Sequence, residues 1–311
     1  MKKRLSLLTL FICFALIVGC SNKAEKSTTI KIGTMPSVDS LPLAIAQEKG
    51  LFEKYNVKVE LQVFNSPLQR DSALQANEIQ GVIADSVALG LFQNANLDMK
   101  VVSLSSGNFN LIVREDANIK DVKDLKGKKV IISENTVIDF LNDQLLQQAG
   151  LTSKDVEKVV IAAVPARLEA LNNKQADAII LPAPYDTFAT KQGHKIIKTI
   201  ANEEQQIALL LLHNDILTNN KQGVGNFVKA YNEAVDYLNN VDQATIQELI
   251  ITTVGYSKND IKTIKLPNFM PITLPDATKV NEALAWSKDK GIITKEINAE
   301  DLMVEINVTF K

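Results

Sequence analysis

The sequence is poor in the residues that build metal-stabilised and disulfide-stabilised scaffolds. Its 311 residues include two cysteines, Cys13 and Cys20, and two histidines, His194 and His213. This inventory argues against a zinc site of four cysteines, or of two cysteines and two histidines, and it leaves no disulfide framework. Lysine and arginine number 34 against 36 acidic residues, so a basic nucleic-acid-binding surface is not expected.

The sequence also lacks the motifs of common enzyme classes. It contains no G-x-S-x-G, no P-loop, no G-x-G-x-x-G and no H-E-x-x-H. His213 has only Asp215 close to it in sequence, which does not make a metal site. We therefore expect no catalysis, no cofactor and no metal. Hydrophobic residues, by contrast, make up 46% of the chain, enough for one large or two medium domains with cores of their own.

Residues 1–19 predict a secretory signal that ends at a lipidation site. Three basic residues precede the mostly apolar run Leu5–Val18, which is too short to span a bilayer comfortably. The run leads into Ile-Val-Gly-Cys, which resembles a lipobox, where cleavage occurs before a cysteine that carries a diacylglycerol thioether. We expect lipidation at Cys20 and a polar tether over residues 20–29. The alternatives are an ordinary signal with an incidental Cys20, or an uncleaved anchor.

Strand-like and helix-like segments alternate from residue 29 onward. Residues 57–64 alternate apolar and polar positions, as a strand does, and residues 41–55 form an amphipathic helical pattern. Such alternation is typical of α/β folds with parallel sheets and right-handed crossovers. The continuous apolar run 207–212 predicts a strand buried on both faces, and the chain after it is mostly helical, with Gly291 ending the last helix.

Two extended apolar segments divide the chain into lobes. Asn110–Asp116 and Glu204–His213 each lie where one αβ block gives way to the next, and we interpret them as two crossing strands. Lobe 1 then comprises residues 30–112 plus 206–311, and lobe 2 comprises residues 113–205. The crossing strands would act as a hinge. One continuous sheet, or two sequential domains, are the alternatives.

The expected ligand site lies where strands end and helices begin. In open α/β sheets, ligands bind at the carboxyl ends of the strands. Helix N-termini there present free N–H groups and a positive dipole end, so facing lobes would wall a cleft for a small polar ligand. The expected ligand-binding residues are Pro36, Ser37, Asp39, Asn65, Ser66, Asp85, Ser86, Ser106, Asn108, Asn135, Thr136, Pro182 and Tyr185, and Phe109 is a further aromatic residue near a junction.

Some residues near these junctions have structural alternatives. Ser66 suits a helix cap better than a ligand contact, because Gln69 follows at the capping-box spacing. Asp85 would cap a helix too, although its place at the end of a short apolar strand favours ligand contact. Arg70 has Asp71 beside it as an ion-pair partner, and Arg167 suits an ion pair on the surface or between the lobes.

Four segments together carry a family resemblance. They are I-G-x-M-P at 32–36, L-P-x-A-x-A-x-x-x-G-L-F at 41–52, D-S-A-L-Q-A-N-E-I-Q-G at 71–81 and I-K-D-V-K-D-L-K-G-K at 119–128. With them, the sequence over about residues 30–240 resembles bacterial substrate-binding proteins of the nitrate/sulfonate/taurine and thiamine-pyrimidine group. The resemblance implies a type II periplasmic-binding-protein fold in a monomer that delivers its ligand to the permease and ATPase of an ABC importer. A lipid anchor would hold it at the extracytoplasmic face of the cell membrane.

The charged residues expected at the cleft bear on the ligand class. Family members often place aromatic or basic residues in the first loop, where this chain has Pro36–Asp39. A cleft with Asp39 and Asp85, and with Arg70 as the one nearby cation in sequence, favours a zwitterion, an amine or a neutral heterocycle over a plain inorganic anion. The alternative functions are an enzyme of thiamine-precursor synthesis, which needs a His-rich or Cys-rich iron site and a cytosolic chain, and a surface receptor that kept the fold.

Overall fold

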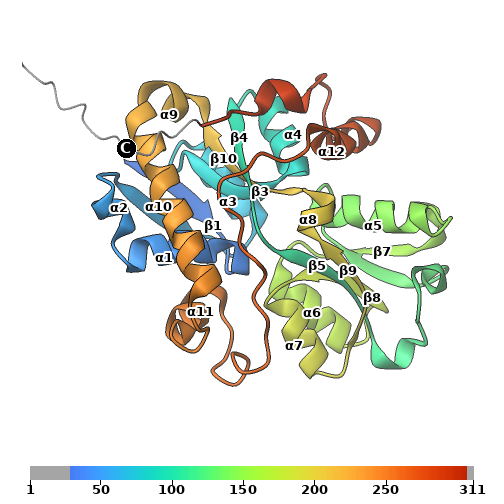
Figure 1. Ribbon diagram of the computed structural model, residues 1–311. Coiled ribbons are helices and arrows are strands. Elements are labelled where there is room, and N and C mark those ends of the chain that lie inside the picture. The colour runs from blue at the N-terminus through green and yellow to red at the C-terminus, as the bar shows by residue number, and fades with distance from the viewer. Residues whose placement is uncertain (1–28, 307–311) are drawn as a thin grey trace, which may run out of the picture.

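Two five-stranded sheets organise the chain, one in each lobe (Figure 1). The computed structural model describes residues 29–306, so the expected signal peptide and Cys20 lie outside the described residues. The sheets have the strand orders β2-β1-β3-β10-β4 and β7-β6-β8-β5-β9. Their strands are β1 (Ile30–Thr34), β2 (Val59–Val63), β3 (Gly81–Asp85), β4 (Met99–Leu104), β5 (Asn108–Val113), β6 (Lys129–Ile132), β7 (Glu157–Val160), β8 (Ala178–Pro182), β9 (Lys195–Ala201) and β10 (Ala208–His213).

Both sheets are mixed, which corrects the expectation of parallel sheets. Strand β1 pairs in parallel with β2 and β3, but β10 runs antiparallel to β3 and β4. In the second sheet β6 pairs in parallel with β7 and β8, and β5 runs antiparallel to β8 and β9. The two exceptions, β5 and β10, are the strands that arrive from the other lobe. Each begins at the interlobe end of its sheet, where its neighbours end, and so it must run the opposite way.

The chain passes between the lobes through two short segments. It leaves the first sheet after Leu104 and joins the second at Asn108, and it returns between Ala201 and Ala208. Strand β5 therefore belongs to the second sheet, and the first crossing precedes the boundary at residue 112 that the sequence suggested. The polar segment 105–107, rather than the apolar strand after it, makes the crossing. The hydropathy of residues 105–107 resembles that of an ordinary loop, so the sequence pattern did not mark the crossing there.

One buried side chain ties the two crossing segments together. Asn202 is 2% exposed, and its Nδ2 donates to the carbonyl oxygen of Ser105 at 2.8 Å and to that of Ala208 at 3.3 Å. Its Oδ1 accepts from the backbone N–H groups of Ile207 and Ala208, both at 2.9 Å. The amide thus bonds backbone groups of both crossing segments, and at Ala208 it adds to the carbonyl bond that the N–H of Ser105 already makes at 2.9 Å.

Helices cover both faces of each sheet. In the first lobe one face packs against α1, α2, α10 and α11, and the other against α3, α4 and α12. In the second lobe α5 covers one face, while α6 and α7 cover the other. The helices are α1 (Leu41–Glu48), α2 (Leu51–Lys54), α3 (Pro67–Gln75), α4 (Ser86–Asn94), α5 (Val137–Gln148), α6 (Val164–Asn172), α7 (Tyr185–Lys191), α8 (Asn202–Gln205), α9 (Asn214–Asn219), α10 (Lys221–Asn240), α11 (Gln247–Val254) and α12 (Ala277–Asp289).

Local sequence signals account for several element boundaries. Gly50 adopts φ 63° and divides the expected helix 41–55 into α1 and α2, because this left-handed conformation interrupts the helical backbone. Gly291 adopts φ 73° just after α12, as expected for a helix-ending glycine. The apolar run before His213 forms β10, whose residues from Ala208 to Leu212 are all buried. Within residues 29–306, no helix combines the length and apolar character needed to cross a membrane.

Candidate functional site

A cavity of about 120 Å³ is lined by residues of both lobes. It has room for several water molecules, which suits a small organic molecule. The first lobe contributes Met35, Pro36, Ser37, Asp39, Asn65, Pro67, Arg70, Ile83, Ala84, Asp85 and Ala208, and the second contributes Phe109, Thr136, Val137, Ile138, Val164, Arg167, Pro182 and Tyr185.

The starts of five helices border this cavity. Pro67, Val164 and Tyr185 are the first residues of α3, α6 and α7, and Asp85 and Thr136 are the N-caps of α4 and α5. These helices follow strands that end between the lobes, which is the arrangement that the strand-to-helix junctions predict. The cavity therefore receives the positive ends of helix dipoles from both sides.

Eight of the thirteen expected ligand-binding residues line the cavity, and five do not. Those that line it are Pro36, Ser37, Asp39, Asn65, Asp85, Thr136, Pro182 and Tyr185. Those that do not are Ser66, Ser86, Ser106, Asn108 and Asn135. Contact with a ligand stays a prediction for all eight.

Two of the serines that do not line the cavity serve the backbone. Ser66 caps α3, where its hydroxyl accepts from the N–H of Gln69 at 3.3 Å. Ser86 is fully buried, and its hydroxyl donates to the carbonyl oxygen of Ile207 at 3.3 Å. Ser66 therefore fits the cap alternative, and Ser86 faces the second crossing segment instead of the cavity.

The other three residues lie beside the crossing segments or before a helix. Ser106 is buried, and its hydroxyl accepts from the N–H of Met270 at 3.3 Å. Asn108 is exposed, and its Oδ1 accepts from the N–H of Asn202 at 3.2 Å. Asn135 adopts φ 57° in the turn before α5. Sequence position alone cannot separate such turn and cap roles from ligand contact, because both use the same short polar side chains.

Arg70 lines the cavity with its charge already paired. Its side chain is 4% exposed, and Nε and Nη2 each lie 2.8 Å from Oδ1 of Asp71. Its Nη1 donates to the carbonyl oxygen of Ile83 at 2.9 Å. The ion pair considered from the sequence is therefore present, and Arg70 acts mainly as part of the cavity wall.

Arg167 lines the opposite wall without an acidic partner among residues 29–306. It is 2% exposed, and its guanidinium donates to two carbonyl oxygens, those of Ile161 at 2.9 Å and Ala162 at 2.7 Å. Burial lowers the pKa of Arg167 to about 10, so the group stays charged at neutral pH. The sequence offered an ion pair as its role, and only the fold places it at the cavity.

Two carboxylates from the first lobe face the same space. Burial raises the pKa of Asp39 to about 6, although the hydroxyl of Ser37 and the charge of Arg70 oppose the shift. Burial also raises the pKa of Asp85, again opposed by Arg70, and Asp85 accepts the N–H of Ala88 at 2.9 Å as the cap of α4. Both carboxylates would gain from a donor that replaces lost water.

The rest of the lining is largely apolar and was mostly not anticipated. Met35, Ile83, Phe109, Val137 and Val164 narrow the cavity around the charged groups. Of these, only Phe109 stood out in the sequence, as an aromatic residue near a junction. A signal was available for Val137 and Val164, because first-turn residues of helices that follow strands lie next to the caps. Among residues 29–306, no group of three or more His, Cys, Asp and Glu residues is arranged to hold a metal ion.

Comparison with known proteins connects this geometry to a family. The family model described as NMT1/THI5 like matches residues 37–245. A putative ABC transporter periplasmic binding protein of Brachyspira hyodysenteriae is 28% identical over 286 residues, covering 83% of this chain and 80% of that protein. A putative aliphatic sulfonates-binding protein of Bacillus subtilis is 30% identical over 251 residues, covering 76% of this chain and 74% of that protein. The crystal structure of the periplasmic aliphatic sulphonate binding protein SsuA from Escherichia coli has the same fold, with a TM-score of 0.75, 20% identity and coverage of 91% and 94% of the two chains.

Proposed function

The chain belongs to the NMT1/THI5-like family and is a solute-binding protein of an ABC import system, and we propose that it captures a small zwitterionic ligand in the cavity between its lobes. The observation that carries this proposal is the division of charge across the cavity. Arg167 of the second lobe has no acidic partner among residues 29–306, and Asp39 and Asp85 belong to the first lobe.

The second-lobe wall suits the anionic end of the ligand. A buried guanidinium that bonds only carbonyl oxygens attracts an anion strongly, because little water competes for it. The first turns of α5 and α6 lie at the same wall, so their dipoles add to this attraction. The sulfonate named for the Bacillus subtilis relative supports a sulfonate or a similar oxyanion as this group.

The first-lobe wall suits a cationic or hydrogen-bond-donating end. Asp39 and Asp85 are acceptors, and an ammonium group beside them would restore the ionised form that burial disfavours. A plain inorganic anion would meet these carboxylates and be repelled. An amino sulfonate or a related zwitterion satisfies both walls at once.

Capture would close the cleft. A ligand that touches both walls shifts the equilibrium between open and closed lobes by its differential affinity for the two states. The crossing segments 105–107 and 202–207 supply the hinge, and the importer's permease and ATPase complete transport. Lipidation at Cys20 would keep the protein at the extracytoplasmic face of the membrane.

Calorimetry with the full chain tests the ligand class. We expect 2-aminoethanesulfonate to bind more tightly than ethanesulfonate, ethylamine or nitrate, each of which satisfies one wall, by at least about tenfold because each lacks one charge-assisted contact. Tightest binding of nitrate, or binding of none of the four, would contradict the zwitterion proposal. The anchor is tested separately, since Cys20→Ala should move the protein from the membrane fraction to the soluble fraction.

A further inference from the structure

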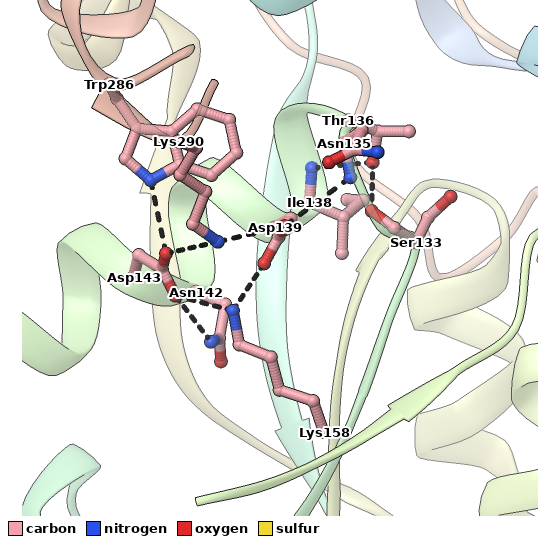
Figure 2. Close-up of polar contacts among 10 residues, drawn as sticks. All are labelled: Ser133, Asn135, Thr136, Ile138, Asp139, Asn142, Asp143, Lys158, Trp286 and Lys290. Carbon is pink, nitrogen blue, oxygen red and sulfur yellow. Dashed lines mark hydrogen bonds and ion pairs between the residues drawn. The ribbon is translucent and has the colours of Figure 1, made fainter. Parts of the chain in front are cut away.

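Outside the cavity, α12 of the first lobe contacts α5 of the second lobe through an ion cluster (Figure 2). Nζ of Lys290, which follows α12, lies 3.2 Å from Oδ2 of Asp139 and 2.8 Å from Oδ2 of Asp143. Trp286 of α12 donates its Nε1–H to Oδ2 of Asp143 at 3.1 Å. The two carboxylates belong to consecutive turns of α5, so one lysine and one tryptophan hold this helix against the other lobe.

Each carboxylate is shared between a lysine of its own lobe and a lysine of the other. Lys158 on β7 lies 2.5 Å from Oδ1 of Asp139 and 2.8 Å from Oδ1 of Asp143. Lys290 contacts the remaining oxygen of each carboxylate. Asp139 is 2% exposed and Asp143 is 15% exposed, so solvent screens these pairs less than it screens surface pairs. Of these two lysines, Lys290 is the one that bonds across the lobes, and Lys158 would keep the carboxylates compensated if the lobes separated.

The carboxylate of Asp139 is also joined to the cavity wall. Asp139 Oδ2 accepts from the backbone N–H of Asn135 at 3.4 Å, in the turn that leads to Thr136. Thr136 caps α5, where its Oγ1 accepts from the N–H of Ile138 at 3.2 Å, and both residues line the cavity. Figure 2 shows this turn and the ion cluster on the same stretch of α5. The interlobe bond therefore lies within about one helical turn of the second-lobe ligand wall.

We propose that Lys290 is a positioning residue for ligand binding, because it holds α5 against α12 in the lobe arrangement in which both walls face the cavity. Its role is to raise ligand affinity without touching the ligand. A ligand that binds one arrangement has its apparent affinity reduced by the fraction of protein in other arrangements, so a bond that favours this arrangement strengthens binding. The inference rests on the proposed function, since only a ligand that contacts both lobes benefits.

Lys290→Met and its matched control Lys158→Met test this role in the full chain. Both remove one ammonium group from the same two carboxylates, but only the first removes an interlobe bond. We expect Lys290→Met to weaken binding of 2-aminoethanesulfonate at least about fivefold and Lys158→Met to leave it within about twofold. Lys290→Arg keeps the charge and should restore most of the affinity. Equal affinities for wild type and Lys290→Met would overturn the proposal.

A ligand-free measurement separates this proposal from the proposed function. Small-angle scattering should give Lys290→Met a larger radius of gyration than wild type and Lys158→Met. Raising sodium chloride from about 0.02 M to about 0.5 M should expand wild type more than Lys290→Met, because only wild type has the Lys290 pairs for salt to weaken. Lys191 of α7 and Asp260 form a second interlobe ion pair that both proteins keep, so its response to salt is common to the two. If 2-aminoethanesulfonate fails to bind wild type while these radii behave as expected, the ligand proposal fails and the role of Lys290 in holding the lobes stands. An unchanged or smaller radius for Lys290→Met overturns that role.

Discussion

Arg70 and Asp71, consecutive residues of α3, form an ion pair of 2.8 Å at the cavity wall, whereas Arg167 on the opposite wall bonds only backbone carbonyl oxygens. The two guanidinium groups at the cavity therefore differ in how freely they can pair with an anionic ligand. The charge of Arg70 is largely balanced by its own neighbour in the chain. An incoming anion would gain most from Arg167, because no acidic side chain among residues 29–306 is paired with its guanidinium.

Replacing Arg167 should cost more ligand affinity than replacing Arg70. Arg167→Lys keeps a positive charge but loses the fixed fork of donors, and we expect it to weaken binding of 2-aminoethanesulfonate by about tenfold or more. Arg70→Lys is the matched control, and its effect should be smaller. Calorimetry measures both, with circular dichroism to verify folding. A larger loss for Arg70→Lys would contradict the assignment of the anion to the second lobe.

Ligand binding should weaken in acid because of Asp39. Burial raises the pKa of this carboxyl to about 6, so it is mostly protonated below that pH in the ligand-free protein. We expect the affinity to fall below pH about 6, by a factor that approaches tenfold per pH unit. Because a sulfonate keeps its charge over this range, the fall would follow the protonation of Asp39. Asp39→Asn should bind more weakly near neutral pH but lose this dependence. Persistence of the slope in Asp39→Asn would assign it to another group.

The raised pKa of Asp39 also makes the free energy of unfolding depend on pH. The folded state holds the Asp39 proton up to pH about 6, whereas the unfolded chain releases it near the ordinary aspartate pKa of 3.8. The contribution of Asp39 to the free energy of unfolding therefore falls as the pH rises through this window and is constant above it. Urea titrations of ligand-free wild type and Asp39→Asn should diverge across this window in that direction. A divergence of opposite sign would contradict the buried, protonated carboxyl.

Asn202 should be critical for stability although it does not line the cavity. Asn202→Ala leaves two buried N–H groups and two carbonyl oxygens without their side-chain partner, and we expect a loss of about 3 kcal/mol in the free energy of unfolding. Asn108→Ala removes one part-buried bond to the same crossing and should cost less than about 1 kcal/mol. Urea titration compares the two variants. Similar losses would show that the amide of Asn202 is not what joins the crossings.

Trp286 should report lobe closure. It is the one tryptophan of the sequence, and it contacts the second lobe through Asp143 and through the ring of Phe140, with ring centroids 5.5 Å apart. If ligand holds the lobes together, acrylamide should quench its fluorescence less after 2-aminoethanesulfonate is added. Arg167→Lys at the same ligand concentration should show a smaller change. Equal quenching with and without ligand, under conditions where calorimetry shows binding, would mean that this contact does not open.

Local patterns in the sequence determined most individual elements. The Ser66–Gln69 spacing marks the start of α3, Gly291 marks the end of α12, and the apolar run before His213 marks β10. Each signal acts between residues within about one helical turn or one strand, where the hydrogen bond or the buried face is set by the neighbouring residues themselves. Eight of the residues expected at the junctions after the strands line the cavity, and their contact with a ligand stays a prediction.

Only the tertiary structure decided how the two lobes meet. The direction of β5 and β10, the crossing at residues 105–107, the place of Arg167 at the cavity and the bond of Lys290 to Asp139 all depend on where one lobe lies relative to the other. Lys290 and Asp139 are 151 residues apart, and neither has a pattern around it that names its partner. Periodicity records which face of an element is buried, but the choice of the surface that buries it is made by packing between elements that are distant in sequence.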